Sequence, residues 1–304
     1  MESFQLNEIL LNKIADLILA KKNVALKKLV KDIHFADMAE IIDELNVAEG
    51  VYLIKLFDSE KTSEILTELD EDVREKILKA LSVKEIADEI EELDSDDAAD
   101  ILSELSEKRK KQVISEISNN NLADNLKELL SYNEDSAGGL MAKELIKANE
   151  NWSVSKCLNE IKKQGENITR VHSVYVVDDN EKLIGRLSLK DLITSSSKSI
   201  IKDIYIPKVD SVNVLEKGED IAKIMSKYDL EAIPVVDDKK HLVGRITIDD
   251  IVDFIIDEAE EDYLLAAGVQ GDVEADDSII ELTKARLPWL FLGLVGGLGS
   301  VFIL

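Results

Sequence analysis

A segment in the second half of this chain occurs twice, and this duplication constrains the fold more than any other feature. The two copies begin at Ser173 and Ala232, and Val-Val-Asp-Asp, then Leu-x-Gly-Arg, then a final Asp recur in register with an offset of 59 residues. Each copy opens with a short β-branched run, at Val174–Val177 and at Ile233–Val236, that ends in an Asp-Asp turn. The pattern predicts two copies of one unit in which a strand pair lies between helices.

The first half of the chain has a helical periodicity instead. Between Met1 and Tyr132 there is no proline and one glycine, Gly50, while apolar residues recur at intervals of three and four. This half also repeats, because Glu68–Asp72 realigns 24 residues later with Glu92–Asp96. Such a period predicts short helix pairs that stack into a superhelical array, each pair burying its apolar face on the next.

The charge of the chain limits its partners. It carries 63 acidic and 37 basic side chains, a formal net charge of -26. This charge repels phosphate backbones, so no nucleic-acid partner is expected, and cations are the natural ligands. The single cysteine, Cys157, cannot form an internal disulfide, which fits a reducing cytosol.

The C-terminal segment differs from the rest of the chain. Residues 287–304 carry no charge and are just long enough to begin a membrane-spanning helix. Lys284 and Arg286 precede the segment, so residues 1–286 are expected on the cytoplasmic side of a cell membrane. A single tail anchor and the first of several membrane helices both fit, and the spacing of Gly293 and Gly297 favours packing against further helices.

Two motifs in the repeats resemble a tandem pair of CBS domains: Gly185–Asp191, with the sequence GRLSLKD, and Gly244–Asp250, with the sequence GRITIDD. Together with the junction Leu130–Met141 (LSYNEDSAGGLM) and the segment Arg286–Leu290 (RLPWL), the order of features is similar to the MgtE family of Mg2+ transporters over essentially the whole chain. The resemblance implies a homodimer with a membrane pore downstream of this sequence. We expect the homodimer to form through the apolar strand faces of the CBS repeats.

The expected fold is a multidomain α+β protein with an all-α superhelical N domain and a tandem CBS pair of βαββα type. The boundaries are 1–132 for the acidic helical-repeat domain, 136–197 and 198–257 for the two CBS domains, 258–286 for a connecting helix, and 287–304 for the start of a first transmembrane helix.

The sharpest local feature is a run of eight acids without a lysine or arginine, on the helix expected after the second repeat: Asp249, Asp250, Asp253, Asp257, Glu258, Glu260, Glu261 and Asp262. Like charges one turn apart destabilise a helix by a few tenths of a kcal/mol for each pair, so bridging cations are expected to stabilise this run. A solvated acidic face is the alternative.

The family resemblance implies that acids of the N domain, the second CBS domain and the connecting helix share Mg2+. The implied ligands are Asp96, Asp100, Glu219, Asp229, Asp250, Asp253, Glu258, Glu261 and Asp262. One position departs from the family pattern, because Lys217 stands where an acid is often found. Scattered carboxylates suit Mg2+, which keeps several waters and uses one or two carboxylates at each site.

A second kind of site follows from the CBS resemblance. The Ser or Thr and the final Asp of the motif often hold an adenine nucleotide, here Ser188 with Asp191 and Thr247 with Asp250. The alternative is that these residues cap the helices that follow. ATP is therefore a possible second ligand.

The leading hypothesis is the cytosolic sensor and gate of a Mg2+ channel, in which Mg2+ bridges acids and favours the closed state. No phosphate-binding loop, zinc spacing or nucleophile elbow occurs, so an enzyme is not expected. Two alternatives stay open: a nucleotide-sensing CBS module of a membrane protein, and a helical scaffold with a tail anchor.

Overall fold

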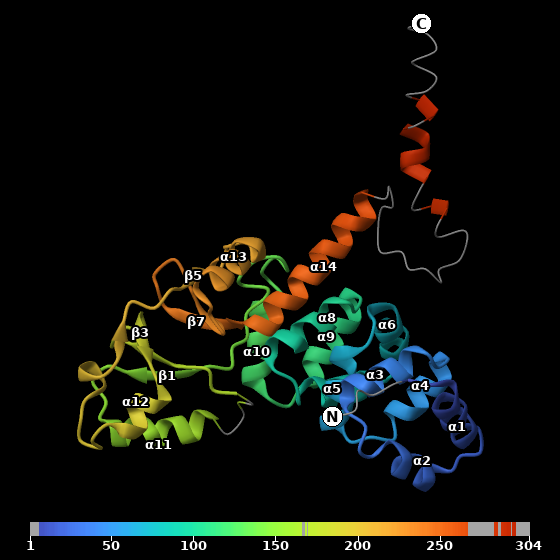
Figure 1. Ribbon diagram of the computed structural model, residues 1–304, viewed down its shortest axis with the longest axis horizontal. Helices are drawn as coiled ribbons and strands as arrows, with labels where there is room; N and C mark the ends of the chain where they lie inside the picture. Colours follow the sequence, from blue (N-terminus) through green and yellow to red (C-terminus); the bar gives the residue numbers. More distant parts are fainter. Residues whose placement is uncertain are drawn as a thin grey trace, which may run out of the picture.

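The computed structural model describes residues 6–165, 168, 170–266, 283–284, 287–292 and 294–295. Figure 1 shows a helical domain and a pair of mixed α/β units lying side by side, with one long helix, α14, projecting from their junction.

The N-terminal half consists of short helices: α1 (Glu8–Leu19), α2 (Asn23–Val30), α3 (Phe35–Asp43), α4 (Val47–Ile54), α5 (Ser59–Glu68), α6 (Glu71–Ala80), α7 (Val83–Ile90), α8 (Ser95–Ser103), α9 (Glu107–Glu116) and α10 (Asn120–Leu129). Local capping defines several of their starts. Asn46 with Glu49 and Ser82 with Glu85 form capping boxes that satisfy the first amides of α4 and α7. The predicted all-helical domain is confirmed.

The 24-residue repeat of the sequence corresponds to equivalent buried positions. Ile77 and Leu78 on α6 are fully buried, and their counterparts Ile101 and Leu102 on α8 are at most 2% exposed. Alternate helices pack on one another along the array, as in α3 with α5, α5 with α7 and α7 with α9. Each helix therefore buries its apolar face on the next repeat.

The second half contains two βαββα units. The first is built from β1 (Ile146–Asn149), α11 (Val154–Gln164), β2 (Val174–Val177), β3 (Leu183–Leu187) and α12 (Leu189–Thr194), and the second from β5 (Val212–Asn213), α13 (Gly218–Tyr228), β6 (Ala232–Val236), β7 (Leu242–Thr247) and α14 (Ile248–Ala266). A short 3-10 helix, η2 (Ile201–Asp203), and β4 (Ile206–Pro207) connect them. The two units confirm the predicted CBS architecture.

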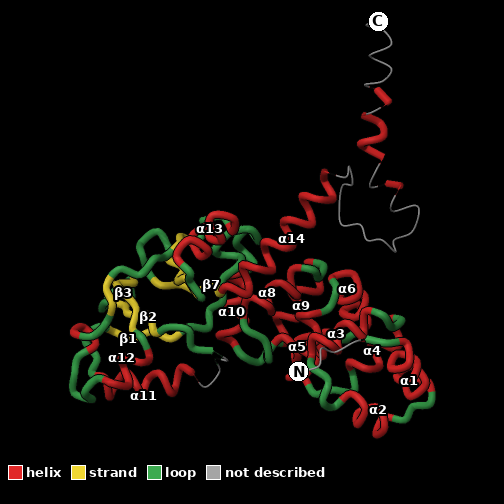
Figure 2. The backbone as a smooth tube through the Cα atoms, viewed as in Figure 1, coloured by secondary structure: helices red, strands yellow, loops and turns green. Residues whose placement is uncertain are grey.

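The two sheets share one topology, and Figure 2 shows them as separate groups of strands. In each unit the first strand runs parallel to the second, which pairs antiparallel with the third, and β4 extends the first sheet. Val174–Val177 and the apolar side chains of Ile233–Val236 are buried within the subunit. These strand faces are consequently unavailable as the dimer surface expected from the sequence, and the homodimer itself stays a prediction.

The hydrophobic cores of the domains are connected unequally. One continuous cluster of buried side chains runs from the helical domain through Ala137 and Met141 into the second CBS unit, where it includes Ile233 and Ile246. The first CBS unit has a separate core. The helical domain is therefore packed against the second CBS unit, and the site described below lies at that contact.

α14 begins inside the second CBS unit and continues to Ala266, so the predicted boundary between residues 257 and 258 falls within one continuous helix. Most of the predicted connecting helix after Ala266 lies outside the described residues, and of the predicted membrane segment only 287–292 and 294–295 are described. Within the described chain, no helix is both long enough and apolar enough to cross a membrane.

Candidate metal site between the helical domain and the second CBS unit

The segment that joins the helical domain to the CBS units lies between α8 and β7. Ala142 and Arg245 exchange two backbone hydrogen bonds, of 2.8 and 2.9 Å, which fix this segment along β7. Gly244 permits the close approach, because a Cβ at this position would lie 2.6 Å from Met141 Sδ and 2.9 Å from the Ala142 carbonyl oxygen. A larger residue here would push the joining segment away from the strand.

The start of α8 is held by the same segment. The Glu144 carboxylate accepts hydrogen bonds from the backbone amide of Ser95, at 3.0 Å, and from its hydroxyl, at 2.7 Å. The Ser95 hydroxyl in turn accepts from the amide of Lys143 at 2.8 Å. Glu144 therefore supplies the side-chain cap that Asp94, the N-cap residue of α8, does not provide.

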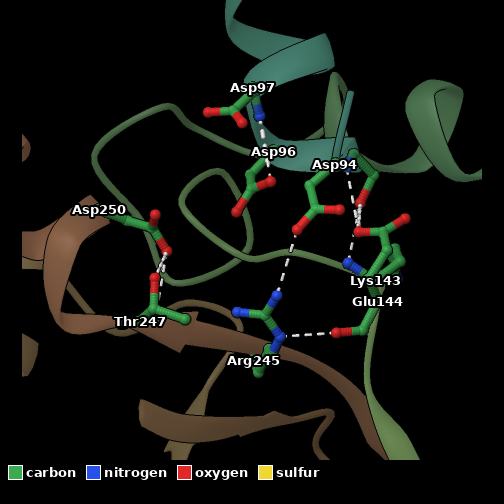
Figure 3. Close-up of polar contacts among 9 residues, drawn as sticks. Asp94, Asp96, Asp97, Lys143, Glu144, Arg245, Thr247 and Asp250 are labelled. Atoms are coloured by element: carbon green, nitrogen blue, oxygen red, sulfur yellow. Dashed lines mark hydrogen bonds and ion pairs between the residues drawn. The ribbon is translucent and has the colours of Figure 1, made fainter. Parts of the chain in front are cut away.

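Acids from three segments of the chain surround this point (Figure 3). One carboxylate oxygen from each of Asp94, Asp96 and Glu144 lies within 4.8 Å of the other two. Asp96 is only 8% exposed, and its Oδ1 accepts one hydrogen bond, from the Asp97 amide at 3.1 Å. No other set of three such side chains in the described part of the chain meets this spacing.

Asp250 reaches the same region from the first turn of α14. Its carboxylate accepts hydrogen bonds from the Thr247 amide, at 2.9 Å, and from the Thr247 hydroxyl, at 2.5 Å, so it caps the helix to which it belongs. Figure 3 shows Asp250 on the opposite side of the site from Asp94, with Asp96 and Asp97 between them. Asp250 is therefore held in place from the CBS side while the other acids are held from α8.

The electrostatic effect of this crowding is seen in the acids of α8. Burial, reinforced by the charge of Asp250, raises the pKa of Asp96 well above its usual value. Burial and Asp250 also raise the pKa of Asp97 to about 7. Burial raises the pKa of Asp100 to about 7, although the nearby guanidinium of Arg74 acts in the opposite direction. These acids are consequently costly to ionise together without a cation.

The structure brings Asp250 near two of the other sequence-predicted ligands, since the charge of Asp250 contributes to the raised pKa of Asp96 and of Asp100. Asp253 lies one turn further along α14, where burial and Asp250 raise its pKa. Burial and Asp253 also raise the pKa of Glu68 at the end of α5, which brings a second helix of the N domain to this face of α14.

The other predicted ligands lie elsewhere. Glu219, in the first turn of α13, forms an ion pair with Lys223, and Asp229 ends the same helix in the left-handed conformation at φ 50°. Glu258 and Asp262 lie further along α14, half-buried and exposed respectively. Glu261 is on the same helix, but its side chain lies outside the described part of the structure.

Reasoning from the sequence missed several members of the cluster, namely Glu68, Asp94, Asp97, Glu144 and Arg245. Asp94 and Asp97 stand beside predicted ligands in the run Leu93–Asp100, so the density of acids there was a usable signal. Glu144 gives no such signal, because only the fold brings the joining segment onto α8.

The donor set fits a hard divalent cation. The three grouped side chains, Asp94, Asp96 and Glu144, offer carboxylate oxygens, which Mg2+ and Ca2+ prefer. The acids come from separate elements instead of one loop. Such an arrangement suits Mg2+, which retains several waters and takes few protein ligands.

The predicted nucleotide residues occupy helix caps. The Ser188 hydroxyl accepts from the Lys190 amide at 3.2 Å, Asp191 follows in the first turn of α12, and the Thr247 hydroxyl is engaged by Asp250. A cavity of about 660 Å³ adjoins the second motif, and its lining includes Ile248, Asp249, Arg170 and His172.

Comparison with known families divides the chain into recognised parts. Residues 33–135 match the family described as the MgtE intracellular N domain. Residues 137–198 and 201–257 each match the CBS domain family.

Individual relatives agree with this division. The chain is 36% identical over 176 residues to the magnesium transporter MgtE of Enterococcus faecalis and 35% identical over 178 residues to that of Thermus thermophilus, in each case over 58% of this chain. These matches cover 39% and 40% of the relatives, so the chain spans about two fifths of the length of the curated relatives it matches.

Two solved structures are similar over most of the fold. The cytosolic domain of the Mg2+ channel MgtE in complex with ATP aligns with a TM-score of 0.75 and 28% identity, over 80% of this chain and 99% of that one. The soluble part of a magnesium transporter aligns with a TM-score of 0.71 and 28% identity, over 83% and 99%.

Proposed function

The chain belongs to the MgtE family, and from this premise we propose that it is the cytosolic Mg2+-sensing and gating region of a Mg2+ channel or transporter. In this role, Mg2+ bridges acids of the helical domain and of the second CBS unit. A transport function, with no catalytic step, is the activity proposed for the whole protein.

The observation that carries the proposal is the position of the α8 acids opposite Asp250. The α8 acids and Asp250 belong to domains that are held together by one contact surface, where burial, reinforced by the charge of Asp250, raises the pKa values of Asp97 and Asp100 to about 7. A divalent ion between these carboxylates offsets their burial and their repulsion, and it binds the docked arrangement more tightly than any arrangement in which the acids are apart. Mg2+ therefore shifts a two-state equilibrium by the ratio of its affinities for the two states.

The direction of α14 connects this equilibrium to the membrane. α14 carries Asp250 and Asp253 in its first turns and then projects beyond the CBS unit (Figure 1). Undocking of the helical domain removes contacts from this helix and changes its position. We propose that the C-terminal segment continues into the membrane, with residues 1–286 on the cytoplasmic side.

The test is a Mg2+ titration of Asp250→Asn with Asp253→Asn. Ligand-induced stabilisation follows RT ln(1 + [L]/Kd) at each site, so the double variant is expected to lose most of the Mg2+-induced rise in melting temperature. In chelator the variant should be as stable as the wild type or slightly more stable, because it has less repulsion. Asp16→Asn, an exposed acid on α1, is the matched control.

An identical Mg2+-induced shift in the wild type and the double variant would contradict the assignment of these two acids. Calorimetry at matched ionic strength separates specific binding from general screening, which acts over roughly 10 Å at 0.1 M salt.

A second ligand is supported by one further observation. The cavity of about 660 Å³ beside the second CBS motif is large enough for a nucleotide-sized molecule, and a similar cytosolic domain was solved with ATP. We propose adenine-nucleotide binding by the CBS pair as a secondary property, with Ser188, Asp191 and Thr247 as candidate contacts. ATP titration of Asp191→Ala, with Mg2+ held constant, tests it. Unchanged ATP affinity would exclude the first motif.

A further inference from the structure

We propose that Arg245 is a built-in counter-cation that favours docking of the helical domain on the second CBS unit, in addition to bound Mg2+. The inference rests on the proposed function, because it assigns the regulation of the same acidic site. Its basis is the placement of one buried guanidinium beside three segments that carry acids.

Arg245 makes its contacts from a fixed position. The residue is only 6% exposed, and both its backbone hydrogen bonds go to Ala142. Its Nε donates to the Glu144 carbonyl oxygen at 2.6 Å, and its Nη2 donates to Asp94 Oδ2 at 3.3 Å. One side chain thus joins β7, the joining segment and the N-cap of α8.

The charge of Arg245 lies against a carboxylate in this contact. Its guanidinium forms an ion pair with Asp94 at 3.3 Å, and only 8% of the Arg245 side chain is exposed. The guanidinium therefore attracts Asp94 within a group of carboxylates that repel one another. Because Arg is permanently charged, this attraction persists when no divalent ion is present.

The first CBS unit contains a natural comparison. Arg186 occupies the equivalent position of the repeated Leu-x-Gly-Arg motif, 59 residues earlier, and it is exposed on β3. The same residue type at the same position of the two units thus has different surroundings. Only the copy in contact with the helical domain is buried against acids.

In this arrangement two cations, the Arg245 guanidinium and Mg2+, offset the negative charge of the site. Arg245 offsets part of the negative charge of Asp94, while the remaining negative charge of the site binds Mg2+. A fraction of the chains is consequently docked before Mg2+ binds, and the ion binds this fraction. Such preorganisation raises the apparent affinity for Mg2+. The apparent Kd equals the intrinsic Kd divided by the fraction of chains that is docked, so a larger docked fraction lowers the apparent Kd.

The test measures docking directly in the full 304-residue chain, solubilised in detergent. Ser106→Cys on the helical domain and Lys239→Cys on the second CBS unit are both at exposed positions and can carry spin labels. The native thiol is buried, and burial raises the pKa of Cys157 to about 11, so it should remain unlabelled. Pulsed electron resonance then gives the distribution of label separations in chelator and across a Mg2+ titration.

Arg245→Met is expected to broaden the distribution in chelator and to raise the Mg2+ concentration at half-saturation by at least about fivefold, the lower end of ordinary coupling between sites. Arg186→Met removes the same charge from an exposed position and should behave as the wild type. Arg245→Lys should recover only part of the effect, because an ammonium cannot reproduce the two-directional donation of the guanidinium.

Asp94→Asn separates the attraction between Arg245 and Asp94, here called the latch, from repulsion among the acids. The Asp94 side chain is 27% exposed, so this variant should fold even if the variants of the buried Arg245 do not. The latch predicts that docking in chelator becomes weaker in this variant. If acid repulsion dominates, removing Asp94 makes docking tighter, and that result overturns the proposal, as do equal distributions for Arg245→Met and the wild type. A wild-type chain that binds no Mg2+ in calorimetry contradicts the proposed function instead, whatever the label separations in chelator.

Discussion

Individual carboxylates at the contact between the helical domain and the second CBS unit determine how the protein responds to pH. Asp97 and Asp100 have pKa values raised to about 7, against about 3.9 for an unfolded aspartate. Between these values the folded state binds more protons than the unfolded state, so stability falls as the pH rises through this window. Bound Mg2+ reverses the preference because it holds the carboxylates ionised.

We therefore predict that, in chelator, the melting temperature decreases between about pH 5 and pH 8, and that the stabilisation by Mg2+ increases over the same range. Each proton released on binding should weaken the apparent Mg2+ affinity about tenfold per pH unit below 7, since one pKa unit corresponds to about 1.4 kcal/mol. Melting curves of the wild type and of Asp97→Asn with Asp100→Asn measure both effects. A double variant with the pH dependence of the wild type would exclude these two acids as its source.

At the same scale, the family resemblance named Asp96, Asp100 and Asp250 as ligands, and the structure brings Asp250 close enough to the other two to contribute to their raised pKa values. Their role as Mg2+ ligands stays a prediction. Arg245 and Glu144 could not be assigned to the site from the sequence. The ion pair between Asp94 and Arg245 forms only where the helical domain packs on the second CBS unit. The two residues are 151 positions apart in the sequence, so no local pattern indicates the pair.

Within the N domain, basic side chains donate hydrogen bonds to the backbone carbonyls at the ends of neighbouring helices. Arg109 on α9 donates from Nη2 to the Leu78 carbonyl oxygen at 2.7 Å and also to that of Leu81, at the end of α6. Arg74 donates from Nη1 to three carbonyls at the end of α5. Lys61 donates to the carbonyl of Val30, the last residue of α2, and to that of Ile33 beyond it. These cations satisfy carbonyl groups that a helix end leaves without partners.

The prediction at the element scale concerns Arg109→Met. The substitution keeps the apolar stem of the side chain but leaves half-buried carbonyls at the end of α6 without their donor. We expect a loss of about 2 kcal/mol in the free energy of unfolding, in the range for hydrogen bonds to charged groups. Lys111→Met, an exposed residue on the same helix, should change stability by less than about 0.5 kcal/mol. Chemical denaturation in chelator measures both, and equal stability of the two variants would contradict the capping role.

Elements were more predictable than their contacts. Periodicity identified the helical half, and the duplicated motif identified both CBS units, because each pattern reports burial within one element or one repeat. The continuity of α14 across residues 257 and 258 was not anticipated. The sequence has no glycine or proline near that point, so nothing in it separates a domain helix from a connecting helix.

If two copies of the chain associate, the contact must use a surface other than the buried strands. Strands β2 and β6 are buried, whereas apolar side chains are exposed on α12 and α14, the last helix of each repeat. Ile193 on α12 is 72% exposed, and Val252, its counterpart 59 residues later on α14, is 45% exposed. Ile255 and Ile256 extend this exposed surface along α14. Exposed apolar side chains that follow one another along a helix, as on α14, are typical of an interaction site.

We predict that two copies of the chain associate through α12 and α14. The two helices occupy equivalent positions in the repeats, so the surface has an approximate internal symmetry that suits a self-complementary contact between identical subunits. Ile193→Asp with Val252→Asp should convert a dimer to a monomer in sedimentation at tens of micromolar, because each substitution places a carboxylate in an apolar contact. Leu19→Asp, on α1 and 85% exposed, is the matched control and should leave the mass unchanged.

If the double variant Ile193→Asp with Val252→Asp and the control sediment alike, the subunits associate elsewhere or not at all. If the dimer dissociates while each chain still binds Mg2+ in calorimetry, ion sensing is a property of the single subunit, as the location of the acidic site within one chain requires.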